Sequence, residues 1–179
     1  MCAAAATGGD LELRGVDPSQ FSTVLHFINQ AGCDIISSGR SVRVISNGRL
    51  RAVDKIVTAP YPGFPTDAQP VLMAAMLKAQ GKTEIRENIF ENRYRQAPEL
   101  RRLGADIVIR GRDAEIWGVE RLQGTVLTAT DLRGGAAMIV AGLCAEGETV
   151  ICDSGHITRG YERFDARLRS LGADIYLEH

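Results

Sequence analysis

The sequence predicts an α/β fold in which a structural unit of about 70 residues occurs three times. A helix that ends in glycine and runs into a small residue, aspartate and isoleucine recurs around Asp34, Asp106 and Asp174, which lie 72 and 68 residues apart. A helix of small residues that ends in glycine and precedes a strand also recurs three times, at residues 3–13, 73–85 and 137–151. Because glycine readily takes the left-handed conformation that ends helices, each pattern indicates a helix followed by a strand.

The second unit contains every expected element in order. Gly81 ends a helix of small and apolar residues, and Gly104 ends a second, amphipathic helix. The segments that follow these glycines alternate between apolar and polar residues, which is typical of half-buried strands. The predicted helices are 68–80 and 95–103, and the predicted strands are 82–87, 105–110, 114–117 and 125–129. Short hairpins are expected over residues 34–44 and 106–117, so we expect parallel and antiparallel pairing to mix within each unit.

The first and third units are shorter than the second. The first begins within its first helix at Met1, and the third ends after a strand expected over residues 173–177. Three full units would need roughly 210 residues on the 70-residue spacing. We therefore expect residues 1–179 to be one domain that is incomplete at both ends and belongs to a longer protein, with units at about 1–58, 59–129 and 130–179.

Composition and motifs exclude several classes of protein. The net charge of −1 gives no general attraction to nucleic acid. The longest apolar run, 136–145, is too short to span a membrane, and no signal peptide precedes it, so a cytoplasmic protein is expected. The four cysteines have neither CxxC spacing nor histidine partners, so we expect small buried side chains and no metal site. Dinucleotide, P-loop and hydrolase motifs are absent, so the sequence gives no support for those classes.

Three arginines precede or begin predicted helices: Arg93, Arg133 and Arg159. The positive end of the helix dipole disfavours a cation at such a position, so an arginine there suggests an external anion such as a phosphate or carboxylate. The alternative is that each is an ordinary exposed arginine. Gly134 and Gly135, next to Arg133, would let a ligand approach the helix.

Two aspartates lie close to these arginines in the sequence. Asp67 and Asp131 each directly precede a predicted helix, where aspartate commonly caps the free N–H groups. The alternative is a catalytic role, since Asp67 follows a loop with prolines at 60, 62 and 65 that would hold its carboxylate stiffly enough to act as a general base.

Four segments together resemble the enolpyruvyl transferase family and occur in the order of that family. They are 64–67 (FPTD), 89–93 (IFENR), 130–133 (TDLR) and 156–163 (HITRGYER). The resemblance covers essentially the whole chain but less than half of the usual length of the family. It implies an inside-out α/β barrel domain made of three βαβαββ units, in agreement with the repeats.

The resemblance also implies roles for individual residues. Asp67 would lie beside the sugar 3-hydroxyl as base or proton relay, and Asp131 would support the site by proton transfer or by orienting Arg133. The Ile89 backbone, Phe90 and Arg93 would contact the uridine sugar. Arg133 and Arg159 would hold the phosphate and carboxylate of phosphoenolpyruvate.

The implied reaction transfers an enolpyruvyl group from phosphoenolpyruvate to the 3-hydroxyl of UDP-N-acetylglucosamine, as the first committed step of peptidoglycan synthesis. The resemblance implies no metal or organic cofactor for this reaction. The missing N-terminal half of the enzyme would supply the other wall of the active site, so the chain alone is expected to be inactive. Two alternatives remain: an enzyme of the 3-phosphoshikimate 1-carboxyvinyltransferase type, and a non-catalytic domain for substrate binding or assembly.

Overall fold

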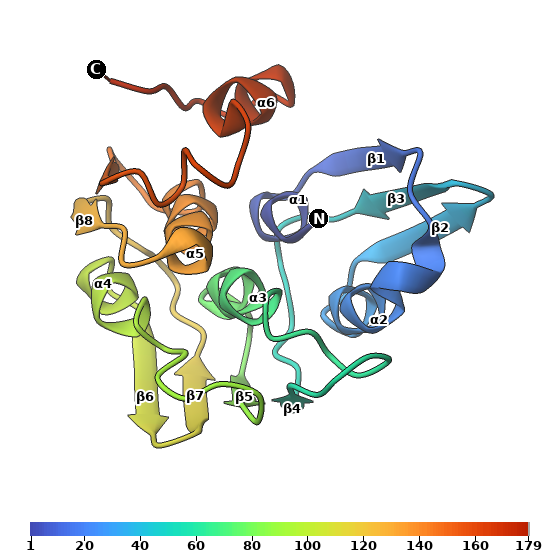
Figure 1. Ribbon diagram of the computed structural model, residues 1–179, viewed down its shortest axis with the longest axis horizontal. Coiled ribbons are helices and arrows are strands. Elements are labelled where there is room, and N and C mark those ends of the chain that lie inside the picture. Colours follow the sequence, from blue (N-terminus) through green and yellow to red (C-terminus); the bar gives the residue numbers. More distant parts are fainter. Residues whose placement is uncertain (179) are drawn as a thin grey trace.

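The computed structural model describes residues 1–178 as a mixed α/β structure with three separate sheets (Figure 1). The helices are α1 (Cys2–Thr7), α2 (Ser22–Gln30), α3 (Gln69–Met76), α4 (Ala97–Arg102), α5 (Leu132–Gly142) and α6 (Phe164–Ser170), with a 3₁₀ helix at Pro18–Phe21. The strands are β1 (Asp10–Arg14), β2 (Asp34–Ser38), β3 (Ser41–Ile45), β4 (Lys55–Val57), β5 (Lys82–Arg86), β6 (Asp106–Arg110), β7 (Asp113–Trp117), β8 (Val126–Thr128) and β9 (Val150–Cys152).

The three sheets share one pattern of strand order. The second sheet, β4-β5-β7-β6, pairs β4 with β5 in parallel and its other strands antiparallel. The first sheet, β1-β3-β2, matches its antiparallel part, and the third, β8-β9, matches its parallel part. The expected mixture of parallel and antiparallel pairing occurs in the second sheet, but the first sheet is antiparallel throughout and the third is parallel, so the expectation of a mixture within each unit is wrong for those two.

Strand pairing crosses the boundaries between the units of the sequence. β4 precedes residue 58 but pairs with β5, and β8 precedes residue 129 but pairs with β9. Each of these two sheets therefore takes its first strand from the preceding sequence unit. The superposition of the three units about one axis stays a prediction.

The core lies where α1, α3 and α5 meet in the middle of the molecule, with the sheets around them (Figure 1). Small side chains on these helices allow close approach, and Met73, Met76 and Met138 fill the space between them at no more than 1% exposure. The prediction that these methionines belong to the core is confirmed. The resulting core is mainly aliphatic, as the low aromatic content requires.

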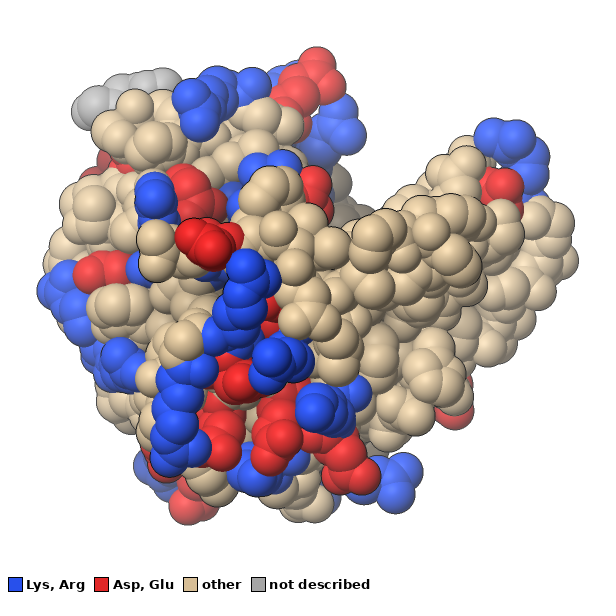
Figure 2. Space-filling view, turned by 60° about the horizontal axis from the view of Figure 1, so that its bottom comes forward, with Lys and Arg blue, Asp and Glu red and all other residues tan. Residues whose placement is uncertain are grey.

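The face of the second sheet that points away from the helical core is exposed to solvent. Cross-strand ion pairs on this sheet include Arg86 with Asp113 at 2.8 Å and Arg110 with Glu115 at 2.7 Å. Figure 2 shows basic and acidic side chains intermixed over the lower part of the molecule, where this sheet lies in Figure 1. Such a mixture produces no strong field of a single sign.

The predicted elements of the second unit agree with the structure to within a few residues, but the strand expected at 173–177 is wrong, because the described part of that segment is not a strand. Arg169 Nε donates to the Ile175 carbonyl at 2.8 Å, as Arg101 does to Ile107 at the start of β6. In the first two sheets this strand pairs with the next strand of its hairpin. The described residues provide no such partner after Ile175, and an unpaired segment gains no ladder of hydrogen bonds.

The structure bears on two expectations from the sequence, the absence of a membrane-spanning segment and the burial of the cysteines. None of the helices within residues 1–178 is long and apolar enough to cross a membrane. Cys2 and Cys33 are buried and Cys144 is partly buried, but Cys152 is exposed on β9, so the prediction of a buried side chain is wrong for Cys152. β9 lacks a neighbour on one edge in the described structure, which leaves this position open.

Candidate functional site

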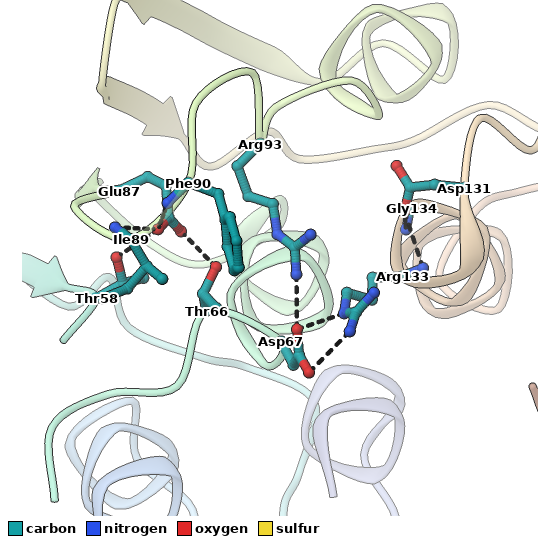
Figure 3. Close-up of polar contacts among 10 residues, drawn as sticks. All are labelled: Thr58, Thr66, Asp67, Glu87, Ile89, Phe90, Arg93, Asp131, Arg133 and Gly134. Atoms are coloured by element: carbon teal, nitrogen blue, oxygen red, sulfur yellow. Dashed lines mark hydrogen bonds and ion pairs between the residues drawn. The ribbon is translucent and has the colours of Figure 1, made fainter. Parts of the chain in front are cut away.

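Asp67 lies at the centre of a cluster formed by three segments that are distant in the sequence (Figure 3). Its carboxylate accepts a hydrogen bond from Arg93 Nη2 at 2.7 Å and another from Arg133 Nη2 at 2.9 Å, and it also contacts Arg133 Nε. Arg93 comes from the loop after β5 and Arg133 from the first turn of α5. The structure therefore brings together three of the predicted site residues around one carboxylate.

Asp67 is not a helix cap. Helix α3 begins at Gln69 with Ala68 as its N-cap, and within residues 1–178 no side chain forms a capping hydrogen bond there. The loop that carries Asp67 is anchored by Phe64, which is 2% exposed and packs edge-on against Phe27 with ring centroids 5.3 Å apart. The Asp67 side chain itself remains 60% exposed and so is accessible to a ligand.

The arginines control the charge of this carboxylate. The hydrogen bond from Arg133 lowers the pKa of Asp67 below its usual value, and the charge of Arg93 acts in the same direction. The same hydrogen bond raises the pKa of Arg133. Asp67 is therefore fully ionised at neutral pH, but it is a weaker base than a free aspartate as long as both arginines hold it.

Phe90 and Arg93 form a second contact within the cluster. The Arg93 guanidinium carbon lies 5.3 Å from the centre of the Phe90 ring, a cation–π arrangement. Phe90 is 53% exposed, and an exposed aromatic ring next to an ion pair offers a stacking surface. Asn92, between them, has a φ of +53°, a conformation that asparagine tolerates better than most residues.

Glu87 is a functional candidate that the sequence reasoning missed. It is 1% exposed at the end of β5, and its carboxylate accepts four hydrogen bonds. The donors are Thr58 Oγ1 at 2.8 Å, Thr66 Oγ1 at 2.9 Å, the Ile89 N–H at 2.8 Å and the Phe90 N–H at 3.1 Å. A carboxylate placed directly after a buried strand is the signal that could have found it, because a buried charge needs several partners.

The hydrogen bond to Glu87 bears on the predicted role of the Ile89 backbone. Since the Ile89 N–H is already used by Glu87, a backbone contact from Ile89 to a ligand has to come from its carbonyl oxygen.

Asp131 is the N-cap of α5. Its Oδ1 accepts hydrogen bonds from the N–H of Arg133 at 2.9 Å and of Gly134 at 2.8 Å, so Asp131 orients the turn that carries Arg133. Gly134 and Gly135 are buried, and a Cβ on Gly135 would lie 2.5 Å from Ile157 Cγ1. The idea that these glycines open the helix to a ligand is wrong, because they allow neighbouring segments to pack closely.

Arg159 is not brought to Asp67. It is exposed and makes no hydrogen bond or ion pair with the rest of residues 1–178. The turn before it is held by Asp153, which accepts hydrogen bonds from the N–H groups of His156, Ile157 and Thr158. Burial opposes ionisation of Asp153, but these donors outweigh it and lower its pKa.

Tyr161 follows the same turn and stacks on Phe164 with centroids 4.6 Å apart. Burial raises its pKa, Arg133 opposes the rise and Asp67 adds to it, so the phenol stays protonated. Tyr161 belongs to the 156–163 motif but was not predicted as a site residue.

A comparison with family sequence models covers the segments that form this cluster. The sequence model of the family described as EPSP synthase (3-phosphoshikimate 1-carboxyvinyltransferase) matches residues 1–168. The chain belongs to this family of enolpyruvyl transferases. Family membership agrees with the expectation from the four sequence motifs.

Individual relatives align with almost the whole chain. A UDP-N-acetylglucosamine 1-carboxyvinyltransferase from Magnetococcus marinus is 48% identical over 176 residues, and one from Brucella ovis is 47% identical over 174 residues. These alignments cover 98% and 97% of this chain but only 42% and 40% of the relatives. The chain thus spans about two fifths of the length of the relatives it matches.

Solved structures support the fold. The enolpyruvyl transferase NikO from Streptomyces tendae matches with a TM-score of 0.86 and 28% identity, over 98% of this chain and 42% of that one. EPSP synthase from Acinetobacter baumannii matches with a TM-score of 0.77 at 21% identity, over 100% of this chain and 45% of that one, which is evidence for the fold alone.

Proposed function

We propose that this chain forms one wall of the active site of a UDP-N-acetylglucosamine 1-carboxyvinyltransferase. The observation that carries the proposal is the Asp67 carboxylate held between Arg93 and Arg133, on a chain whose relatives at 47–48% identity have that name. A carboxylate can take the proton of a hydroxyl nucleophile, and guanidinium groups bind an anionic co-substrate. The cluster offers both within one site.

The proposed reaction has two steps. The sugar 3-hydroxyl oxygen bonds to C2 of phosphoenolpyruvate while a proton adds to C3, which gives a tetrahedral intermediate. Loss of a proton from C3 and cleavage of the bond from C2 to the phosphate oxygen then release phosphate and restore the double bond. The chain's residues act by binding the two substrates, orienting them and moving protons at the sugar oxygen.

The ion pairs of Asp67 suggest how its basicity is controlled. In the free site Arg133 lowers the pKa of Asp67. Phosphoenolpyruvate carries two anionic groups and competes with Asp67 for Arg133, because a guanidinium forms its strongest pairs with carboxylate or phosphate. Loss of one arginine partner raises the pKa of Asp67 and makes it a better base in the presence of the co-substrate.

The other predicted residues act around this centre. Phe90 and the Ile89 carbonyl contact the uridine sugar, and Arg93 holds Asp67 beside them. Asp131 acts through Arg133 as a positioning residue. Arg159, exposed and without a partner among residues 1–178, joins Arg133 on the anionic groups of phosphoenolpyruvate once both substrates are bound.

The wider setting follows from the same proposal. The reaction is the first committed step of peptidoglycan synthesis, in the cytoplasm, with a bearing on cell shape and division and without a cofactor. The N-terminal half of the enzyme provides the other wall and the remaining strands. Together with those strands, units 1–58, 59–129 and 130–179 complete an inside-out α/β barrel, in which helices such as α1, α3 and α5 lie inside the sheets.

A 3-phosphoshikimate 1-carboxyvinyltransferase is the second candidate, because the matching family model carries that description. Relatives at 44–48% identity with the other name favour the uridine sugar, whereas the EPSP synthase structure shares only 21% identity. A non-catalytic binding domain is the third candidate for the chain in isolation.

The test is a chimera in which this chain replaces the segment that it matches in the Magnetococcus marinus relative. We expect phosphate release that needs both phosphoenolpyruvate and UDP-N-acetylglucosamine, whereas the chain alone binds phosphate weakly and releases none. Phosphate release with shikimate 3-phosphate instead would favour the second candidate. A folded chimera that binds the uridine sugar without turnover would favour the third.

A further inference from the structure

Glu87 connects the two parts of the site that have to act together. One carboxylate oxygen, Oε1, accepts from the N–H groups of Ile89 and Phe90 and from Thr58 Oγ1. The other oxygen, Oε2, accepts a hydrogen bond from Thr66 Oγ1, and Thr66 directly precedes Asp67 in the sequence. The carboxylate therefore ties the loop after β5 to the turn before α3 (Figure 3).

These contacts close a ring that passes through the site. Glu87 binds Thr66, which precedes Asp67, and Asp67 binds Arg93. The Arg93 guanidinium lies over the Phe90 ring, and the Phe90 N–H returns to Glu87. Within this ring the Glu87 side chain is buried whereas Asp67 and Phe90 are exposed, so the fixed point lies under the accessible residues.

The cost of burying Glu87 indicates that its position is well defined. A carboxylate that is 1% exposed is tolerated only when its acceptor sites are filled, and no arginine or lysine pairs with it within residues 1–178. Four hydrogen-bond donors fill those sites. Moving either segment leaves part of a buried charge without a partner, so both segments are restrained by the same group.

We propose that Glu87 is a positioning residue that sets the relative placement of the sugar-contacting segment Ile89–Phe90 and the carboxylate of Asp67. It touches no substrate and acts through its two oxygens, one for each segment. The proposal rests on the proposed function where it concerns sugar binding and turnover, and on the structure alone where it concerns the placement of Asp67.

Two threonines allow the oxygens to be tested separately. Thr66→Val removes the only side-chain hydrogen bond to Oε2 that residues 1–178 provide, and so loosens Asp67. Thr58→Val removes a hydroxyl that donates to Oε1 and also accepts from the Asn88 N–H at 2.8 Å, so it loosens the segment that leads to Ile89. Thr149→Val is the matched control, because the Thr149 hydroxyl is buried but has no hydrogen-bond partner among residues 1–178.

In the chimera, we expect Thr66→Val to lower kcat about tenfold with little change in KM for the uridine sugar, since the hydrogen bond that ties the residue before Asp67 to the charged Glu87 is lost. Thr58→Val should raise that KM about tenfold with a smaller effect on kcat. Thr149→Val should change neither constant. Glu87→Gln should retain much of the activity, because its amide oxygen can replace Oε1 and its NH₂ can donate to the Thr66 hydroxyl.

A second measurement does not depend on activity. In the isolated chain, NMR titration of the Asp67 carboxyl carbon should give a higher pKa in Thr66→Val than in the parent chain, because a displaced Asp67 loses contact with Arg133. Thr58→Val should instead shift the amide signals of Ile89 and Phe90.

The outcomes separate the two proposals. An inactive parent chimera would refute the proposed function, and the NMR measurements would still decide the role of Glu87. An active parent whose Thr66→Val and Thr58→Val variants match Thr149→Val in kcat, KM and Asp67 pKa would overturn the positioning role. Equal losses of thermal stability with unchanged kinetics would also overturn it, since they would reduce Glu87 to a structural residue.

Discussion

Replacement of Asp67 by asparagine removes the charge that Arg93 and Arg133 share but keeps the size of the side chain. The amide oxygen can still accept one of the hydrogen bonds, at 2.7 Å from Arg93 or 2.9 Å from Arg133. The two guanidinium groups, however, lose the anion between them. The variant therefore separates the charge of Asp67 from its place in the packing.

We expect Asp67→Asn to change the free energy of unfolding only slightly and the turnover rate strongly. The Asp67 side chain is 60% exposed, and its partners Arg93 and Arg133 are 18% and 36% exposed, so solvent screens both pairs. Exposed ion pairs contribute about 0.2–1 kcal/mol each, and we expect Asp67→Asn to lower the free energy of unfolding by about 1 kcal/mol. A general base contributes about 10²- to 10⁴-fold to the rate, so turnover should fall by at least about 100-fold.

The stability effect should depend on pH. The pKa of Asp67 is lowered in the folded chain, so its pairing stabilises the fold above the pKa of the unfolded state, near 3.9. That contribution is lost as the pH falls through the lower folded pKa. The free energies of unfolding of the parent chain and of Asp67→Asn should therefore differ at pH 7. The part of this difference that comes from the Asp67 ion pairs should disappear at strongly acidic pH.

Urea unfolding of the isolated chain at several pH values, together with phosphate release by the chimera, would measure both quantities. A loss of more than about 3 kcal/mol at pH 7 would contradict the view that solvent screens the cluster. Turnover within about threefold of the parent would remove Asp67 from proton transfer and leave it as an anchor for the arginines.

Three further variants test other parts of the site. Asp131→Ala should cost about 1 kcal/mol in thermal unfolding because α5 loses its cap, whereas Asp131→Asn should cost less. Arg159→Ala should leave the melting temperature unchanged, since the side chain is exposed and unpaired among residues 1–178. It should weaken transition-state binding by about 2–5 kcal/mol, measured from the ratio of kcat/KM between the parent chimera and the variant. Gly135→Ala places a Cβ 2.5 Å from Ile157 Cγ1, so overpacking of about 1–3 kcal/mol should exceed the gain of about 1 kcal/mol in helix propensity. A double-mutant cycle with Ile157→Ala should then show favourable coupling in urea unfolding, and additivity would contradict the contact.

The repeated patterns predicted the fold well because they depend on local chemistry. Gly81 and Gly104 have φ values of +108° and +93°, the left-handed conformation that the helix-ending role requires. The strand expected at 173–177 failed because strand formation needs a partner, which a local pattern does not contain. The exchange of β4 between neighbouring units was missed for the same reason.

The candidate site was predicted in part. Arg93, Arg133 and Asp67 were named from helix starts and motifs, and the structure joins them. Glu87 was missed because its link to the site depends on Thr58 and Thr66, 29 and 21 residues away, and the one local signal, a carboxylate directly after a strand, does not reveal those contacts. The packing role of Gly135 was missed as well, because it depends on Ile157, 22 residues further along the chain.

β4 pairs with β5, and β8 pairs with β9, so each boundary between units separates two strands of one sheet. Dividing the chain at either boundary would break the hydrogen bonds between those strands. In a solenoid each repeat keeps its own elements, so repeats can be added or removed one at a time. Here a 70-residue unit taken alone would lose its first strand to its neighbour and would retain a strand that belongs to the next sheet. The three units are therefore neither modules that can be exchanged nor independent folding units, and the chain is expected to melt in a single transition.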